Sequence, residues 1–116
     1  MIKPNELEWI MSNCYGTEKW YRYFPNNNFL YTDGVKTFCE NAEAYWFISE
    51  VFLMVHGLPE DLYKITLKVE GSKADIIIID GDCKEVKRNH IPFTDCPEGT
   101  WEFYYTDNVF LWYMEY

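Results

Sequence analysis

The sequence predicts an α+β fold: a mainly antiparallel β-sheet of about four to six strands, packed on a central buried helix, with a short N-terminal helix. Three observations lead to it. Residues 35–56 are apolar at helical spacing and then apolar almost throughout. Residues 62–114 contain runs of strand-forming residues separated by short turns. The length of 116 residues is usual for one domain, so we expect a single domain over 1–116.

The N-terminal third predicts a short helix followed by a small hairpin. Within residues 4–14, Pro4 suits a first helical turn, and Leu7, Ile10 and Met11 follow helical spacing. Gly16 is expected to end this helix. Composition then predicts two short strands, at residues 19–24 and 29–31, joined by a turn at 25–28.

The predicted central helix begins after a capping sequence. Thr32 or Asp33 can cap its first turn, and Gly34 permits a tight entry. Asn41 marks a candidate break in the helix. Because residues 44–56 contain few polar residues, we expect this helix to be buried nearly all round and to end at 57–59.

The remaining chain predicts β-structure. Residues 62–70 alternate between apolar and polar side chains, which is typical of a strand with one buried face. Residues 74–79 include four consecutive isoleucines, which favours a central strand covered on both faces. Charged residues predict an edge strand at 85–91. Turns are expected at 71–72 and 80–82, a loop at 92–99, and a final hairpin from strands 101–105 and 109–114 around 106–108.

The charge balance restricts the classes of partner. The formal net charge is −9, from 10 Lys and Arg against 19 Asp and Glu. Binding to nucleic acid or to an anionic membrane depends on neutralising negative charge, so neither is expected. A protein partner with a basic surface is favoured, including one that itself binds nucleic acid. The first residues lack the apolar run of a signal peptide, and no apolar run is long enough to span a bilayer, so we expect a cytoplasmic protein.

Aromatic residues make up 20% of the chain, more than a core of this size needs. Both faces of the predicted C-terminal hairpin are aromatic or apolar, so one face must be covered by the N-terminal elements, by another molecule, or remain exposed. Aromatic residues are enriched at the centres of protein interfaces. The candidate partner-binding residues are therefore aromatic side chains of this hairpin and acidic residues of the β-region: Trp101, Tyr104, Trp112, Tyr113, Asp80, Asp82, Glu85 and Glu102.

Three groups of residues were weighed as chemical sites. His90, Asp95 and Cys96 could supply a thiol nucleophile and its base, and Cys83, His90 and Cys96 could supply three metal ligands, but neither spacing matches a known pattern. Carboxylates at Asp75, Asp80 and Asp82 could bind a cation, but they lack the rest of a calcium loop. Structural roles explain all three groups better, so we expect no catalytic residue, no metal and no cofactor. The four cysteines are expected to be reduced thiols.

Three short motifs carry a resemblance to a known kind of domain. They are GTEKWYR at 16–22, YTDGV at 31–35 and AYW at 44–46. Their order resembles an uncharacterised bacterial domain family with GTExWYR, YTDGV and AYW motifs, which phages and plasmids also carry. The similarity covers about residues 15–116 and departs near residues 63–65. The resemblance implies no activity; it implies a mobile-element context.

These observations lead to one expected function and two alternatives. The expected function is a small acidic non-enzymatic protein that binds and inhibits a basic, nucleic-acid-binding protein, in its sharpest form as an anti-CRISPR-like anti-defence protein. The first alternative is a small hydrolase or nucleotide-acting enzyme that uses His90, Cys96 and Asp80. The second is a homodimeric structural module.

Overall fold

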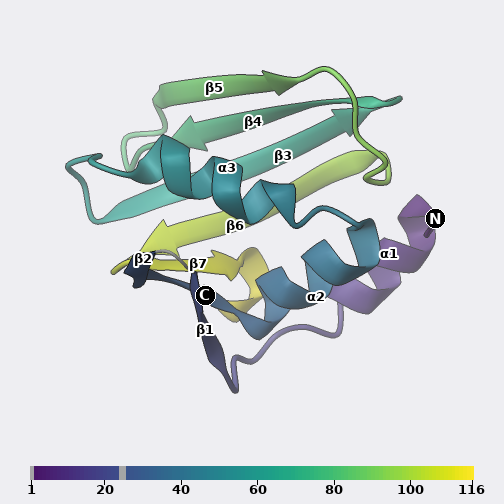
Figure 1. Cartoon of the computed structure of the whole chain (residues 1–116), viewed down its shortest axis with the longest axis horizontal. Coiled ribbons are helices and arrows are strands. Elements are labelled where there is room, and N and C mark those ends of the chain that lie inside the picture. The colour runs from purple at the N-terminus through teal and green to yellow at the C-terminus, as the bar shows by residue number, and fades with distance from the viewer. Residues whose placement is uncertain (1, 24–25) are drawn as a thin grey trace.

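The computed structural model describes residues 2–23 and 26–116, with the side chains of 26–28 excepted, and shows an α+β fold with helices on one face of a seven-stranded sheet (Figure 1). The sheet is mostly antiparallel, as expected, but it has more strands than the sequence predicted. The elements in chain order are α1 (Pro4–Met11), β1 (Trp20–Tyr23), β2 (Asn26–Thr32), α2 (Asp33–Ala42), α3 (Trp46–Val55), β3 (Leu62–Glu70), β4 (Lys73–Ile79), β5 (Glu85–Ile91), β6 (Gly99–Thr106), β7 (Val109–Trp112) and the 3₁₀ helix η1 (Tyr113–Glu115).

The strand order is β1-β2-β7-β6-β3-β4-β5. Strand β3 lies near the middle and pairs with both β4 and β6, so that Lys64 is opposite Ile79 on one side and Tyr104 on the other. The pair β2–β7 is parallel, whereas all other described pairs are antiparallel. This parallel pair joins the small N-terminal hairpin to the C-terminal hairpin, which makes one continuous sheet.

The predicted central helix is two helices. After α2, Glu43 adopts a left-handed conformation with φ of 55°, and the Ala44 amide donates to the Cys39 carbonyl at 2.9 Å, which closes the helix end. The new helix α3 then runs across the sheet in front of β3 and β4 (Figure 1). It buries Phe47 and Val51, but Leu53 is 66% exposed, so α3 is not buried on all sides as predicted.

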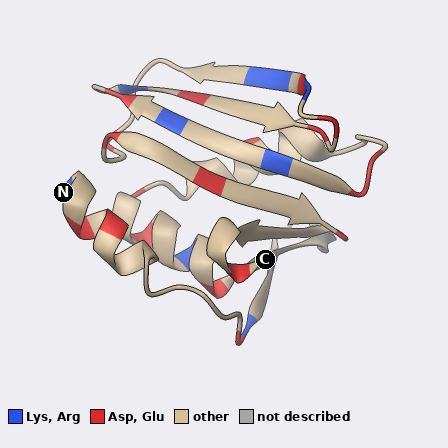
Figure 2. Ribbon diagram, turned by 180° about the vertical axis from the view of Figure 1, so that it is seen from behind, with Lys and Arg blue, Asp and Glu red and all other residues tan. Residues whose placement is uncertain are grey.

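The helices cover one face of the sheet. On β3 the side chains of Ile65 and Leu67 point to this covered face and are fully buried, whereas Lys68 on the other face is exposed. Seen from behind, the strands β3 to β5 carry no helix across them (Figure 2). The prediction that residues 74–79 would be covered on both faces is therefore wrong: Ile76 and Ile78 are buried, and Ile77 is only half-buried.

Several predictions of single turns and strands are confirmed, whereas some element boundaries differ from those predicted. Residues 71–72 form the β3–β4 turn, with Gly71 at a φ of 65° that suits glycine, and β5 is an exposed edge strand. The N-terminal helix ends at Met11, and the last strand ends at Trp112, where η1 begins. The turn predicted at 25–28 is replaced by β2 from Asn26 onward, while Phe24 and Pro25 lie outside the described residues. In the part of the chain that the structure describes, none of the helices combines the length and the apolar character needed to cross a membrane.

Candidate functional site

A small hollow lies between α1 and the C-terminal 3₁₀ helix η1, and it contains three of the four predicted aromatic candidates. Its volume is about 190 Å³, and its walls include Glu8 and Ser12 from α1 and Tyr113 and Met114 from η1. Trp101 and Trp112 contribute the floor. We call this feature the α1–η1 hollow. It is bounded by elements from opposite ends of the chain, because α1 buries Leu7 and Met11 against the core beside β6 and β7.

The two tryptophans of the hollow are core residues. Trp101 is 3% exposed and Trp112 is 5% exposed, so the prediction that they present their side chains to a partner has to be corrected. The reason is the pleat: Trp101, Phe103 and Trp112 all point to the face that the helices cover. Their ring nitrogens are also satisfied internally. Trp101 Nε1 donates to the Pro97 carbonyl at 3.2 Å, and Trp112 Nε1 donates to the Met11 carbonyl at 3.1 Å.

The other two aromatic candidates are accessible. Tyr113 is 45% exposed, and its ring meets that of Trp112 at 65° with the centroids 4.7 Å apart, which makes a corner beside the hollow. Tyr104 is partly exposed on the helix-free face of the sheet, where its ring lies 4.8 Å from that of Tyr116. Accessible aromatic side chains thus occur on both sides of η1, and only Tyr113 belongs to the hollow.

Of the predicted acidic candidates, Asp80, Asp82 and Glu85 lie toward the other end of the strands from the hollow, whereas Glu102 follows Trp101 but is on the helix-free face. Asp80 follows Ile79, which is opposite Lys64 on β3, whereas Thr100 beside the hollow is opposite Lys68. Two of these acids already have basic neighbours: Glu102 pairs with Lys64 at 3.2 Å, and Glu85 pairs with Arg88 at 3.0 Å. The Arg88 guanidinium lowers the pKa of the Glu85 carboxyl from its ordinary value. The structure therefore does not bring these acids together with the hollow.

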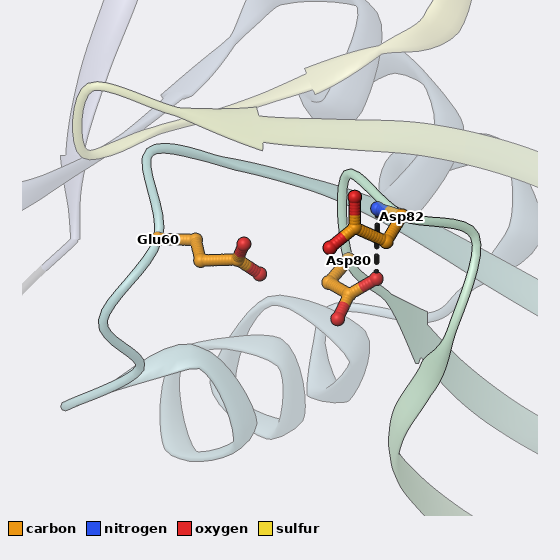
Figure 3. Close-up of side chains that lie close together, drawn as sticks. All are labelled: Glu60, Asp80 and Asp82. Carbon is orange, nitrogen blue, oxygen red and sulfur yellow. Dashed lines mark hydrogen bonds between the residues drawn. The ribbon is translucent and has the colours of Figure 1, made fainter.

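Three carboxylates approach one another at the β4–β5 turn (Figure 3). Glu60, Asp80 and Asp82 each place a carboxylate oxygen within 4.8 Å of the others, and we call them the Glu60 cluster. Asp80 Oδ1 accepts from the amides of Asp82 and Lys84 at 2.9 and 3.0 Å, so it holds the turn. Asp75, which the sequence grouped with Asp80 and Asp82, lies elsewhere on β4 and accepts from or pairs with His90 and Arg88. Exposed carboxylates of this kind are common without a bound ion.

The residues of the predicted enzyme alternative are dispersed. His90 Nδ1 is 2.9 Å from Asp75 Oδ1 on the helix-free face, whereas Cys96 is 3% exposed in the core. Asp80 is five residues along β4 from Asp75, which corresponds to about 16 Å of strand. Burial raises the pKa of the Cys96 thiol to about 12, so it is a poor nucleophile. Cys83 is exposed on the β4–β5 turn, away from Cys96, and all four cysteines are free thiols.

The two motifs GTEKWYR and YTDGV meet around a single carboxylate, that of Glu115. Its oxygens accept from the hydroxyls of Thr17 and Thr32 at 2.9 and 2.6 Å. They also accept from the amides of Gly34 and Trp112 at 3.1 and 2.9 Å. We call this arrangement the Glu115 cluster. It ties the start of α2 to the last turn of the chain, and both chain segments to the loop before β1.

Asp33, the next residue of the YTDGV motif, also connects the start of α2 to the loop before β1. Asp33 Oδ2 accepts from the amides of Glu18 and Lys19 at 3.0 and 3.1 Å, while its Oδ1 is buried without a partner in the described structure. The predicted cap is confirmed in part, because the Thr32 hydroxyl accepts from Val35 N at 3.5 Å. Gly34 is required for a reason that the sequence did not show: a Cβ there would lie 2.8 Å from Trp112 Cβ and would overlap the Glu115 carboxylate. The motifs thus have a structural role.

Sequence reasoning missed two residues that the structure singles out. Glu115 is one residue from the end of the given sequence and shares no motif with its partners, so no local pattern pointed to it. Glu8 is an exposed acidic residue of α1, and sequence alone does not distinguish such a position from ordinary solvated surface. Only the packing of α1 against η1 places Glu8 beside an aromatic wall.

Comparison with known proteins gives a family. Neither the curated proteins nor the solved structures give a match to the chain. A family model does match, over residues 5–116, and its description is a family of unknown function, DUF6876. This confirms the expected membership of an uncharacterised domain family. Since the match covers nearly the whole sequence, the chain belongs to the DUF6876 family of unknown function.

Proposed function

We propose that the protein is a non-enzymatic binding protein whose acidic, aromatic end occupies a basic surface of another protein. The observation that carries this proposal is an uneven distribution of charge and of exposed rings along the chain. Residues 62–91, which contain β3, β4 and β5, hold six Lys and Arg against five Asp and Glu, a formal charge of +1. The rest of the chain holds four against fourteen, a formal charge of −10.

Exposed aromatic side chains follow the same division. Residues 62–91 contain one Phe, Trp or Tyr residue, Tyr63, and it is buried. The well-exposed aromatic side chains of the described residues lie elsewhere in the chain: Trp9, Tyr15, Trp20, Tyr45, Phe93, Tyr113 and Tyr116. Figure 2 shows acidic residues along the helices beside the N-terminus and near the C-terminus, and most basic residues on the strands farther from them, where acidic residues also occur. Acidic surface with exposed rings suits a partner that is both basic and partly apolar.

The sharpest form of this proposal is inhibition of a nucleic-acid-binding protein, for example an anti-CRISPR-like block of a defence nuclease. Such a partner displays Lys and Arg that normally contact phosphates, and an acidic protein placed there would compete with the nucleic acid. The mobile-element context that the motif resemblance implies favours this form. A homodimeric module remains the alternative, because an exposed aromatic surface also serves a second copy of the chain.

The test compares two triple variants that each raise the formal charge from −9 to −6. The first neutralises Glu6, Glu18 and Glu43 at the acidic end, and the second neutralises Asp82, Glu85 and Glu102 in and beside β3–β5. Immobilised protein captures partners from host lysate, and the purified partner is then titrated with each variant at several salt concentrations. We expect the first triple to weaken binding about tenfold or more and the second to have little effect.

Two results would contradict the proposal. Equal losses from the two triples would mean that charge location is irrelevant. A captured partner that keeps its full affinity for nucleic acid when saturated with this protein would exclude the inhibitory form. Sedimentation of the isolated chain distinguishes the homodimeric alternative, which requires a stable dimer without any added partner.

A further inference from the structure

Among the surface hollows, the α1–η1 hollow differs in its chemistry. Glu8 is the one charged residue that lines it, while the other contributors are aromatic, methionine or hydroxyl side chains. The larger hollow on the helix-free face, of about 390 Å³, is instead lined by both signs, including Lys68, Arg88 and Asp75. The α1–η1 hollow combines a single carboxylate with three aromatic residues, whereas a hollow along the outer side of α1 combines Glu6 with Trp9 alone.

The size of the hollow limits what can enter it. Sites for drug-sized ligands occupy about 300–1,000 Å³. A volume of about 190 Å³ is therefore too small for such a ligand but sufficient for one side chain of a protein partner. The floor is also firmly held, because the indole nitrogens of Trp101 and Trp112 are bonded to backbone carbonyls and do not need a ligand.

The walls favour a delocalised cation. Tyr113 exposes nearly half of its side chain and stands at an angle to the Trp112 ring, so a flat group can lie against it. Guanidinium stacks on aromatic rings, is weakly hydrated and binds carboxylates through two parallel hydrogen bonds, whereas ammonium is compact and strongly hydrated. We propose that the α1–η1 hollow receives an arginine side chain of the protein partner, with Tyr113 contacting the guanidinium face and Glu8 accepting its hydrogen bonds.

This inference rests on the proposed function, since it names the group of the basic partner that the acidic end recognises. It makes Glu8 and Tyr113 specificity-determining residues, although both are accessible and neither is needed for the core. Their substitution should leave folding intact. Binding of an isolated arginine derivative is then measurable without knowing the partner.

The first experiment titrates the full chain with N-acetyl-arginine-methylamide and follows backbone and tryptophan indole resonances by NMR. The control ligand is N-acetyl-citrulline-methylamide, which has the same shape without the charge. We expect millimolar binding of the arginine derivative, with the largest shifts at Trp112, Tyr113 and Ser12, and at least fivefold weaker binding of citrulline. A third ligand, N-acetyl-lysine-methylamide, carries the same charge on an ammonium group. Equal binding of the arginine and citrulline derivatives, tighter binding of the lysine derivative, or shifts centred elsewhere would overturn the inference.

The second experiment uses matched variants. Glu8→Gln and Tyr113→Leu should each weaken arginine binding about fivefold or more, while Tyr113→Phe keeps the ring and most of the affinity. Asp95→Asn makes the same charge change as Glu8→Gln at an exposed loop position and should leave the affinity unchanged. Unaltered affinity in Glu8→Gln or Tyr113→Leu would contradict the assignment.

The two proposals can fail separately. A captured partner whose affinity is insensitive to Glu8→Gln and Tyr113→Leu would overturn the arginine site and leave the binding function standing. Specific arginine binding in the hollow, without any basic protein partner, would support the site and remove the proposed function.

Discussion

Two groups of carboxylates in this protein have opposite surroundings. In the Glu115 cluster, one carboxylate is enclosed by donors from four separate residues, two hydroxyls and two backbone amides. In the Glu60 cluster, three carboxylates approach within 4.8 Å of one another at an exposed turn. The first arrangement joins segments that are distant in sequence. The second places like charges side by side.

The difference shows why acidic residues alone do not indicate a site. A carboxylate that satisfies buried donors stabilises the fold, because those donors would otherwise remain unpaired. In the Glu60 cluster Asp80 accepts from two backbone amides, but among the described residues none of the three carboxylates forms an ion pair, so they repel one another. This repulsion costs a little stability at low salt. Substitutions at the two clusters should therefore change stability in opposite directions.

The largest effect is expected from Glu115→Ala. Removal of the carboxylate leaves the buried hydroxyl of Thr32 and the amide of Gly34 without their acceptor. Each unpaired buried group costs roughly 1–3 kcal/mol, so we expect a loss of about 3 kcal/mol in the free energy of unfolding, measured by urea denaturation. Glu18→Ala, at an exposed position in the same region, is the control and should change stability by less than about 0.5 kcal/mol.

Glu115→Gln sharpens the same prediction. Oε2 accepts from Gly34 N and Oε1 accepts from Trp112 N, so each oxygen already faces a backbone donor. Whichever way a glutamine amide is oriented, its NH₂ group points at one of these two N–H groups. We expect a loss of at least about 1 kcal/mol, and a fully stable Glu115→Gln protein would show that the cluster contributes little.

The second largest effect is expected from Gly34→Ala. The added Cβ would lie 2.8 Å from Trp112 Cβ and would displace the Glu115 carboxylate, so overpacking should cost about 2 kcal/mol. Gly16→Ala is the matched control, because a Cβ at Gly16 meets nothing within 4 Å. Thermal unfolding of the two variants tests this, and an equal melting temperature for both would contradict the assigned role of Gly34.

Much of the fold was predictable because it depends on local patterns. The alternation of apolar and polar residues predicted β3, and the two-residue turn at 71–72 predicted the β3–β4 hairpin. The charged residues of β5 predicted an edge strand. The break between α2 and α3 was harder, since its left-handed residue is Glu43 rather than glycine. The parallel β2–β7 pair joins residues about 80 positions apart, and no local pattern reports such a pairing.

For the candidate site, the sequence predicted that aromatic and acidic residues would take part, but not which of them would be accessible or lie together. The alternation of side chains along a strand places Trp101 and Phe103 on one face, but it does not say which face the helices cover. Of the four aromatic candidates, Trp101 and Trp112 are therefore core residues, whereas Tyr104 and Tyr113 remain accessible. The positions of Glu8 in the hollow and of Glu115 at Gly34 depend on tertiary contacts between distant parts of the chain, which no local sequence pattern reports.

A smaller effect concerns the thiol beside the Glu115 cluster. Burial raises the pKa of the Cys14 thiol, and the negative charges of Glu115 and Asp33 raise it further. Because the thiolate is the reactive form, alkylation of Cys14 should reach its half-maximal rate at a pH above the ordinary value for cysteine. The Cys83→Ser variant removes the exposed thiol, and mass spectrometry of iodoacetamide-treated protein then follows Cys14. A midpoint below the ordinary value would show that the carboxylates do not act on this thiol.

The smallest effect, and the one of opposite sign, is expected from Asp82→Asn. This change removes one charge from the Glu60 cluster but keeps the Asp82 amide that donates to Asp80 Oδ1, so the turn itself is preserved. Relief of like-charge repulsion should raise the melting temperature by about 1–3 °C at low ionic strength. In 1 M NaCl the Debye length is about 3 Å, and the gain should largely disappear. Asp95→Asn, outside the cluster, controls for the change in net charge. A gain that persists in high salt, or that Asp95→Asn reproduces, would mean that repulsion within the cluster is not its cause, and the contrast between the two carboxylate groups would then lie in hydrogen bonding alone.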